Sequence, residues 1–509
     1  MPSLRCLRLL LALLLISFAL AVPGMAQDDP GQPGDPGDPV VPPPAFDPEV
    51  KPDTSFTIEG IKAILAEIQP LVEKAIGKPF KQTPEISIAT RAEVEKLLLD
   101  ELIPQMKVLQ PGADEATARM MARAQASMFS QHLLGKCTMA DGHLYIMVEN
   151  FRTMAELLDQ PIVNSRDYLR TTIIHESVHA HDHQQYGALG RLLTAKSTSE
   201  IEVLNALIEG HAQFITRRVL SAEKNDALFE TWEQGITAMP PGLDDSQKMM
   251  AQVMSAAQVF GYIDGRHFFE GLATEAAEHP DFQSDVFAKL PASKNVIARP
   301  YLYYHPERAP KSLPLDAVFA AMRASVGEKW QHQVIELPSV QFRQAFGGLI
   351  DAKRVDEAIK ATVSCHVQAM LPPESMGDKQ VIASIAEMES VAAARSFYQL
   401  QLDLLKAKDE KMKDTEIRIS KAEYKPLGST NAELQTLARK TVVLGAMGQE
   451  IDVCDVVLTK GRFMVEFMVM SIEMDDATVR KHVDAVLAAL ATADEAAARD
   501  ATRTPGSER

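Results

Sequence analysis

Cysteine is scarce in this chain, and so are basic residues relative to acidic ones. Four cysteines stand in 509 residues, too few for a disulfide scaffold, and no CxxC pair is present to form a redox centre. Lys and Arg number 52 against 69 Asp and Glu, and the net charge of −17 argues against a nucleic-acid partner. The sequence also lacks a Gly-rich phosphate loop and a convincing nucleophile elbow around Ser or Cys. Nucleotide-binding and thiol-redox chemistry are therefore not indicated.

Long apolar runs are almost absent as well, and the exception lies at the N-terminus. After two arginines the chain is apolar from Leu9 to about Val22 and then becomes small and polar, which is the order of a secretory signal peptide over residues 1–26. We expect cleavage after Ala26, with Ala21 as a less favoured site; the alternative is an uncleaved membrane anchor. No later stretch is apolar for long enough to span a bilayer. The mature protein is therefore expected to be secreted or periplasmic, without stable membrane insertion.

Changes in composition divide the rest of the chain into four segments. With 509 residues, 46% of them hydrophobic, two folded units are expected. Residues 27–54 are rich in Pro, Gly and Asp and are expected to form an extended linker. We place the first folded unit at 55–351 and the second at 352–495, where the sequence pattern changes, and expect a disordered tail over 496–509.

Hydrophobic periodicity in the first unit predicts a mainly helical α+β fold. Residues 84–90 and 143–150 are expected to form short strands, and helical spacing dominates elsewhere. Asn164 or Ser165 is expected to cap a long helix. Ser199, with a glutamate three residues later, has the capping-box pattern that opens a second helix.

The second unit is predicted to be a separate α+β domain. An Ala- and Met-rich stretch over 379–407 has helical spacing, and the later runs IDVCDVVL and FMVEFMVM are β-rich. A closing helix is expected from Asp475 or Asp476 to about Leu490. The methionines of the second run are interpreted as core residues, because this flexible side chain commonly fills gaps in cores. An unknown binding partner is the hypothesis for this domain.

The stretch TTIIHESVHAHDHQQYG (171–187) carries the strongest chemical signal. Residues four apart on a helix face the same way, so His175 and His179 can present two imidazoles to one ion, and Glu176 points toward the open side of that ion. This is the HExxH arrangement of zinc hydrolases, in which the glutamate is the general base toward a zinc-activated water. The structural alternative is a solvated helix end that is rich in histidine by chance.

A hydrolytic zinc site needs a third protein ligand, and two glutamates are candidates. A metzincin would require histidine where Gln185 stands. Glu202 and Glu209 share a face of the next predicted helix, but Glu202 also has a capping role. Glu209 lies among apolar neighbours, where a carboxylate is costly to bury unless it is paired or bound to a cation, and Gly210 would let the two helices approach closely. We therefore favour Glu209.

The motif and its surroundings resemble a known family. HESVHAHDHQQYG, followed after about thirty residues by LIEGHAQF, is similar to the gluzincin class of HExxH zinc metallopeptidases, specifically exported bacterial proteins with a later EGxA helix. YIDGRHFFEGL (262–272) and the proline-rich segment 290–310 are weaker similarities, and the match covers roughly residues 84–310. The resemblance implies a helical gluzincin-like domain with a small sheet beside the HExxH helix, and it does not cover the second unit.

Carried over residue by residue, the resemblance implies that His175, His179 and Glu209 bind Zn²⁺ and that Glu176 is the general base. The chain is accordingly predicted to be an exported zinc metallopeptidase that acts on a peptide or protein substrate. The alternative hypothesis is a non-catalytic extracytoplasmic binding protein on the same scaffold, in which zinc is structural or absent.

The sequence departs from the family pattern around the motif. Residues 181–183 are His-Asp-His where Leu-Gln-Asp is expected, and His211 stands where an acidic residue is common. An acidic group that orients a ligand imidazole is therefore not assured. His183 is either an alternative ligand or a solvated side chain, and Asp182 either orients an imidazole or is exposed. The donor for the transition-state oxyanion is left open among Tyr262, His267, Tyr304 and His305.

Overall fold

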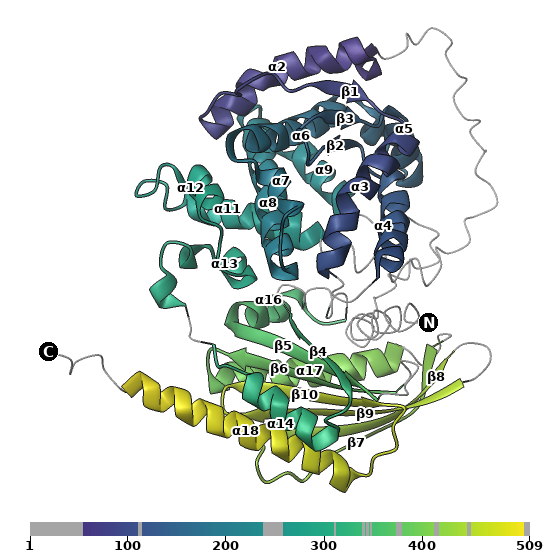
Figure 1. Cartoon of the computed structure of the whole chain (residues 1–509), viewed down its shortest axis with the longest axis vertical. Helices are drawn as coiled ribbons and strands as arrows, with labels where there is room; N and C mark the ends of the chain where they lie inside the picture. Colours follow the sequence, from purple (N-terminus) through teal and green to yellow (C-terminus); the bar gives the residue numbers. More distant parts are fainter. Residues whose placement is uncertain are drawn as a thin grey trace, which may run out of the picture.

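The structure is a computed structural model and describes residues 54–109, 114–237, 258–309, 312–337, 342, 346, 349–372, 379–411, 417–444 and 449–502. The chain is a mixed α+β protein, as predicted: one part is mainly helical and contains a small sheet, and the other is built on a large antiparallel sheet (Figure 1). The predicted signal peptide lies outside the described residues. No helix within them is both long and apolar enough to cross a bilayer.

The N-terminal half of the helical part alternates helices with three short strands. Its elements are η1 (Thr54–Phe56), α2 (Ile58–Ile76), β1 (Ile86–Ile88), α3 (Arg91–Leu109), α4 (Glu115–Ser130), β2 (Gly135–Cys137), β3 (Leu144–Ile146), α5 (Val148–Leu157) and η2 (Pro161–Asn164). The strands form a sheet in the order β1-β3-β2, with β1 parallel and β2 antiparallel to β3. Both predicted strands are present, but β3 is shorter than expected because α5 begins at Val148.

Two long helices, α6 (Arg166–Tyr186) and α8 (Thr198–Ala222), pack against each other in the core of this part. The hydroxyl of Ser165 caps α6 by accepting a hydrogen bond from the backbone N–H of Tyr168, as predicted, and Gly187 ends the helix with φ at 62°. The predicted start of α8 was wrong by two residues. Ser197 is the N-cap instead of Ser199, because the Ser197 hydroxyl accepts from the N–H of Glu200.

Short helices surround α8: α7 (Ala188–Leu192), α9 (Asp226–Thr237), the π-helix η3 (Val259–Asp264), α11 (Gly265–Ala273), α12 (Phe282–Ala288), α13 (Lys294–Ala298), η4 (Pro300–Leu302) and η5 (Pro306–Arg308). One of them lies unusually close to α8. A Cβ atom on Gly210 would lie 2.2 Å from the carbonyl carbon of Gly265, and one on Gly265 would lie 2.1 Å from the carbonyl oxygen of Ala206. Gly210 thus permits a close helix contact, as predicted, but the neighbouring helix is α11 and not α6.

The second part is a seven-stranded sheet in the order β4-β5-β6-β10-β9-β8-β7, in which all neighbours are antiparallel. Its elements are α14 (Asp316–Val326), β4 (Gln331–Glu336), α16 (Ala352–Ala361), β5 (Thr362–Leu371), β6 (Gln380–Met388), α17 (Val391–Lys411), β7 (Ile417–Lys425), β8 (Gln435–Leu444), β9 (Gln449–Lys460), β10 (Phe463–Met470) and α18 (Asp476–Thr502). Alternate residues point to opposite faces of a strand. Accordingly Val456 and Leu458 pack with α14 and α18, whereas Val457 packs in the core that contains α17.

Several predictions for this part need correction. The stretch 379–407 is not one helix: residues 380–388 form the buried strand β6, and α17 begins only at Val391. The runs predicted as β-rich are β9 and β10, and the closing helix continues to Thr502, into the predicted tail. The domain limits stay predictions, although the sheet extends across the limit at 352, because β4 pairs with β5.

A short bridge through α13 joins the two parts. Lys294 Nζ donates to Oε2 of Glu202 on α8, at 2.6 Å. On the other side, Asn295 Nδ2 donates to the carbonyl of Val363 at 2.9 Å, and Arg299 donates to the carbonyl of Thr362 at 2.6 Å. The helix that carries Glu202 is therefore connected to the first residues of β5 through six residues of chain. The cysteines within the described residues, Cys137, Cys365 and Cys454, are buried, and none of them forms a disulfide.

Candidate metal centre

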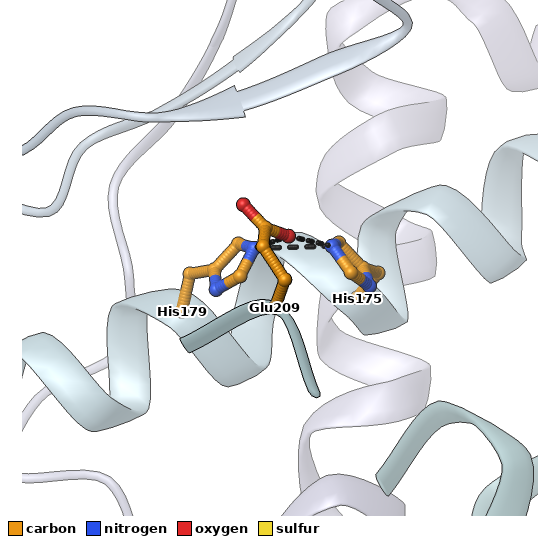
Figure 2. Close-up of side chains that lie close together, drawn as sticks. All are labelled: His175, His179 and Glu209. Atoms are coloured by element: carbon orange, nitrogen blue, oxygen red, sulfur yellow. Dashed lines mark hydrogen bonds and ion pairs between the residues drawn. The ribbon is translucent and has the colours of Figure 1, made fainter. Parts of the chain in front are cut away.

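Helices α6 and α8 bring three ligand-type side chains together. His175 and His179 lie on the same side of α6, and Glu209 reaches them from α8 (Figure 2). The two Nε2 atoms are 3.0 Å apart, and each lies 3.3 Å from Oε2 of Glu209. Within the described ranges, no other group of three or more His, Cys, Asp or Glu side chains offers ligand atoms within 4.8 Å of one another.

These separations fit a tetrahedral metal ion. Bonds of about 2.0 to 2.1 Å from zinc to imidazole nitrogen or carboxylate oxygen, at tetrahedral angles, place neighbouring ligand atoms about 3.3 Å apart. An imidazole that binds through Nε2 carries its proton on Nδ1, so its Nε2 lone pair is free for the ion. Three protein ligands leave one coordination position open, which is typical of hydrolytic sites and not of structural ones. The three residues can therefore hold a divalent metal ion.

The negative charge of Glu209 lies beside two buried imidazoles, where a positive charge would stabilise it. His175 is 3% exposed and His179 is 5% exposed, whereas the Glu209 side chain keeps 24% of its surface accessible. Burial alone would raise the pKa of Glu209, but the adjacent imidazoles of His179 and His175 hold it well below its ordinary value. Glu209 therefore stays ionised, and an ionised carboxylate at this depth is stabilised by a bound cation.

Glu176 lies beside this group, against the edge of β2. A Cβ atom on Gly135 would lie 2.6 Å from Cγ of Glu176, so the glycine leaves the space that the carboxylate fills. The backbone N–H of Cys137 donates to the same carboxylate. Burial, with the nearby negative charge of Glu209, raises the pKa of Glu176 to about 7. A carboxyl group with this pKa can both accept and return a proton near neutral pH.

Tyr262, one of the four oxyanion candidates, lies at this centre. Its ring stacks on His175 with 5.7 Å between the ring centroids and 13° between the planes. Its hydroxyl is hydrogen-bonded to Glu209, and burial together with that carboxylate raises the pKa of Tyr262 well above its ordinary value. The phenol therefore keeps its proton and can donate a hydrogen bond. It belongs to the π-helix η3, a type of local irregularity that is frequent at functional sites.

The other candidates named from the sequence have different surroundings. Glu202, the rejected ligand, forms an ion pair of 2.6 Å with Lys294. The remaining oxyanion candidates contact other groups or solvent: the Tyr304 hydroxyl donates to Asp285 at 3.2 Å, His305 lies 3.5 Å from Glu275, and His267 is exposed. Of the candidates that the sequence left open, only Tyr262 is assigned to the centre.

Among the described residues, no acidic group contacts the Nδ1 atoms of the two ligand-type imidazoles. Nδ1 of His175 and Nδ1 of His179 are buried, and neither finds a hydrogen-bond partner among the described residues. Asp182 is not exposed but completely buried, and its carboxylate lies 2.7 Å from Nδ1 of His211 and 3.4 Å from Nδ1 of His181. Asp182 therefore connects α6 to α8, one helical turn beyond His175, His179 and Glu209, which together are called the metal-type group below.

Two residues near the centre were missed by sequence reasoning. The ring of Trp232 lies 5.2 Å from that of His175 and covers it from α9. Lys136 is buried next to the Glu176 carboxylate and forms an ion pair of 3.0 Å with Glu101. Neither could be found from spacing, because Lys136 reaches α6 only through the pairing of β2 with β3, and Trp232 only through the packing of α9.

Comparison with known proteins adds little to these observations. No known protein family matches the sequence, and no curated protein matches it. Among solved structures, the chain is similar to a protein from Chloroflexus aurantiacus described as a "putative hydrolase with a novel fold". The sequence identity is 19%, the match covers 51% of this chain and 92% of that chain, and the TM-score is 0.35. The resemblance to gluzincins therefore depends on the sequence motifs alone.

Proposed function

We propose that the chain is an exported zinc-dependent metallopeptidase. The observation that supports this most directly is the convergence of His175, His179 and Glu209 at distances suited to one tetrahedral ion, with Glu176 beside them. A zinc ion in such a site polarises a carbonyl group and lowers the pKa of a water molecule bound to it.

In this proposal, Glu176 transfers the protons, Tyr262 stabilises the developing negative charge, and the aromatic rings exclude water. Glu176 accepts the proton of the attacking water and later returns it to the leaving amine, for which its pKa of about 7 is suited. Tyr262, whose hydroxyl hydrogen is bonded to Glu209 in this structure, would turn it toward the carbonyl oxygen as negative charge develops there. Trp232 and the stacked ring of Tyr262 cover His175 and limit the access of bulk water to this side of the centre.

The edge of β2 supports a peptide as the substrate. Thr138 N–H bonds to the His143 carbonyl and Met147 N–H bonds to the Leu134 carbonyl, so residues 134, 136 and 138 face β3. Gly135 and Cys137 consequently face away from β3, toward Glu176, and no strand within the described residues pairs with this side of β2. Cys137 is already engaged, its N–H by Glu176 and its carbonyl by Lys136 Nζ at 2.8 Å, so an extended peptide would pair with this edge through the backbone groups of Gly135.

The test combines metal analysis with one conservative substitution. Purified mature protein is expected to contain about one zinc per chain and to cleave members of a fluorogenic peptide library. Glu176→Gln should keep the zinc and lose peptide cleavage by at least about 100-fold, because it removes the proton acceptor and not a ligand. Equal cleavage by both proteins would refute the proposed role of Glu176.

A pair of glutamate variants tests the third ligand. Glu209→Gln should lose most of the zinc, whereas Glu202→Gln, which alters the ion pair with Lys294, should retain it. The two substitutions make the same chemical change, seven residues apart on one helix. If Glu202→Gln loses zinc and Glu209→Gln does not, the ligand assignment is wrong.

A non-catalytic binding protein on the same scaffold is the second candidate. It is favoured by the absence, among the described residues, of any hydrogen-bond partner for the Nδ1 atoms of His175 and His179, since orienting partners support activity in most zinc enzymes. Bound zinc without turnover of any library peptide, together with a lower melting temperature in chelator, would support this candidate.

The proposal includes export of the chain and an unidentified binding partner for the sheet part. The N-terminal sequence supports secretion or location in the periplasm, with removal of residues 1–26 and a soluble mature form. N-terminal sequencing of the protein recovered from its native compartment should begin at Gln27. We expect no nucleic-acid binding, given the net charge of −17, and an unidentified partner for the sheet part.

A further inference from the structure

A groove between α2 and β1 contains a second set of reactive side chains. It has a volume of 740 Å³ and is lined by α2, by residues 83–87 and by His143. It lies at the β1 edge of the small sheet, whereas the metal centre lies at the β2 edge, and β3 separates the two. None of the residues assigned to the metal centre lines this groove.

Three lining residues form a continuous chain of contacts. Oγ of Ser87 lies 2.9 Å from Nε2 of His143, and Nδ1 of the same imidazole lies 3.4 Å from Oε2 of Glu85. This contact with the Glu85 carboxylate, whose side chain is 83% exposed, favours the tautomer that carries the proton on Nδ1, because an ionised carboxylate attracts the N–H side of the ring. In the neutral imidazole Nε2 then has the lone pair and accepts the hydroxyl hydrogen of Ser87. This is the arrangement of nucleophile, base and orienting acid.

The small sheet creates this arrangement from two distant segments. Glu85 and Ser87 are two residues apart on the β1 segment and so point to the same face. His143 directly precedes β3, whose Leu144 pairs with Ile86. The His143 side chain is 18% exposed and Ser87 is half-buried, so both are reachable from the groove.

The open edge of β1 supplies hydrogen-bond donors next to the hydroxyl. Leu144 N–H bonds to the Glu85 carbonyl and Ala89 N–H bonds to the Ile146 carbonyl, so residues 85, 87 and 89 face β3. The N–H groups of Ile86 and Ile88 therefore point away from β3, and no strand within the described ranges pairs with them. The N–H that follows a nucleophilic serine is a common donor to the oxyanion.

We propose that Ser87, His143 and Glu85 form a second hydrolytic centre, specific for carboxylic esters. The Ser87 oxygen attacks the ester carbonyl carbon while its proton passes to Nε2 of His143, and that proton then leaves with the alcohol as the C–O bond breaks. Water hydrolyses the resulting acyl-serine by the same proton transfers, releasing the carboxylic acid and restoring the hydroxyl. The groove walls combine the apolar side chains of Leu65, Pro70 and Ile86 with the polar ones of Lys62, Gln69 and Glu73, and the acyl chain would lie against the apolar ones.

Labelling and kinetics on a common background test this proposal. The mature Glu176→Gln protein in chelator provides the background, because ester hydrolysis at the metal centre is then suppressed. A fluorophosphonate probe is expected to form a covalent adduct on Ser87, identified by peptide mass spectrometry. Hydrolysis of p-nitrophenyl butyrate should fall on the order of 100-fold in Ser87→Ala and in His143→Gln, because each removes a member of the proton-transfer pair.

The matched control is Ser127→Ala, the same exchange at a partly exposed position of α4. It should keep the ester hydrolysis rate of the background protein. Absence of the Ser87 adduct, or equal rates for Ser87→Ala and Ser127→Ala, overturns the proposal. The adduct is measured on unaltered Ser87, so a folding defect in one variant does not decide the result. The outcome is also independent of the peptidase proposal, since Glu176 is already replaced.

Discussion

Two of the places where the described residues bury ionisable groups differ in how charge is balanced. Between α17 and the large sheet, Lys440 Nζ lies 2.8 Å from Asp409 and 3.4 Å from Asp455, so each carboxylate faces an ammonium group of the same chain. In the metal-type group, two imidazoles and one carboxylate face each other without any ammonium or guanidinium group among their direct contacts. The two clusters lie in different parts of the protein (Figure 1).

This difference distinguishes a structural cluster from a binding site. A buried lysine with carboxylate partners is a compensated network, and its removal leaves an unpaired buried charge. In the other cluster two imidazole nitrogens and one carboxylate oxygen converge on one point, where a single cation can bind all three. Substitutions in the helical cluster should therefore act on metal binding, and substitutions in the sheet cluster on stability.

The largest effect is expected from the loss of an imidazole. His179→Ala should weaken zinc binding on the order of 1000-fold, because one of three protein ligands is lost. His183→Ala provides the control: it stands four residues further along α6, where its ring lies against Gly142. Competition with a chromophoric chelator measures both affinities. A comparable loss in His183→Ala would mean that the ligand set is assigned to the wrong imidazole.

A smaller loss, of stability and not of zinc, is expected in the sheet cluster. Lys440→Met should destabilise the sheet part by about 3 kcal/mol, because Asp409 and Asp455 are left without their buried partner. Lys425→Met, which removes the solvent-screened ion pair with Asp476, should leave the stability almost unchanged. Denaturant unfolding followed by circular dichroism measures both, and metal analysis should show unchanged zinc content. Loss of zinc in Lys440→Met would contradict the separation of the two clusters.

The contact between α8 and α11 should show an intermediate effect. Gly210→Ala is expected to destabilise the protein by about 2 kcal/mol and to weaken zinc binding, because the new Cβ meets the Gly265 backbone directly after Glu209. Gly190→Ala in α7 is the control, since its Cβ would meet only the carbonyl oxygen of Met139 at 3.8 Å. Alanine should stabilise that helix slightly. Equal melting temperatures for the two variants would show that α8 and α11 can separate without cost.

The smallest effect is a pH dependence of the sheet part. Burial, with the nearby Asp455, raises the pKa of Glu466 from 4.5 to about 7. The folded state therefore holds this proton more tightly than the unfolded state, so the stabilisation is complete below pH 4.5 and is lost as the pH rises through 7. The unfolding free energy should fall between pH 5 and pH 8, and Glu466→Gln should make that fall smaller. An identical pH profile for both proteins would refute the raised pKa of this carboxyl group.

Local patterns were sufficient to predict the helix of His175 and His179 and the third side chain that meets them, Glu209; their role as metal ligands stays a prediction. Ser165 and the spacing of His175 and His179 are properties of one helix, and the choice of Glu209 followed from the cost of burying a carboxylate among apolar residues. The Ser199 cap failed because another serine two residues earlier offers the same hydrogen bond. Residues 380–388 were assigned to a helix because Ala and Met are compatible with the apolar spacing of a helix as well as with that of a strand. Their pairing with β5 and β10 makes them a strand.

Features that depend on the pairing of strands could not be predicted from the sequence. Ser87 and His143 are 56 residues apart and meet only because β1 lies parallel to β3. Gly135 stands beside Glu176 only because β2 is the other edge of that sheet. Hydrophobic periodicity shows which face of a helix or strand is buried, but it does not show which other element packs against that face. The ligand-type side chains on α6 and α8 could therefore be predicted, whereas the contacts made by the three strands could not.

The α13 bridge has a thermodynamic consequence for the whole chain. At one end of the bridge, Lys294 donates a hydrogen bond to Glu202 on α8, seven residues before Glu209. At the other end, Arg299 donates to the backbone carbonyl of Thr362 in β5. If a molecule that binds the sheet shifted this bridge and with it Glu209, the affinity of the metal-type group for an ion would change. Reciprocity then requires the ion to alter the affinity for that molecule by an identical factor.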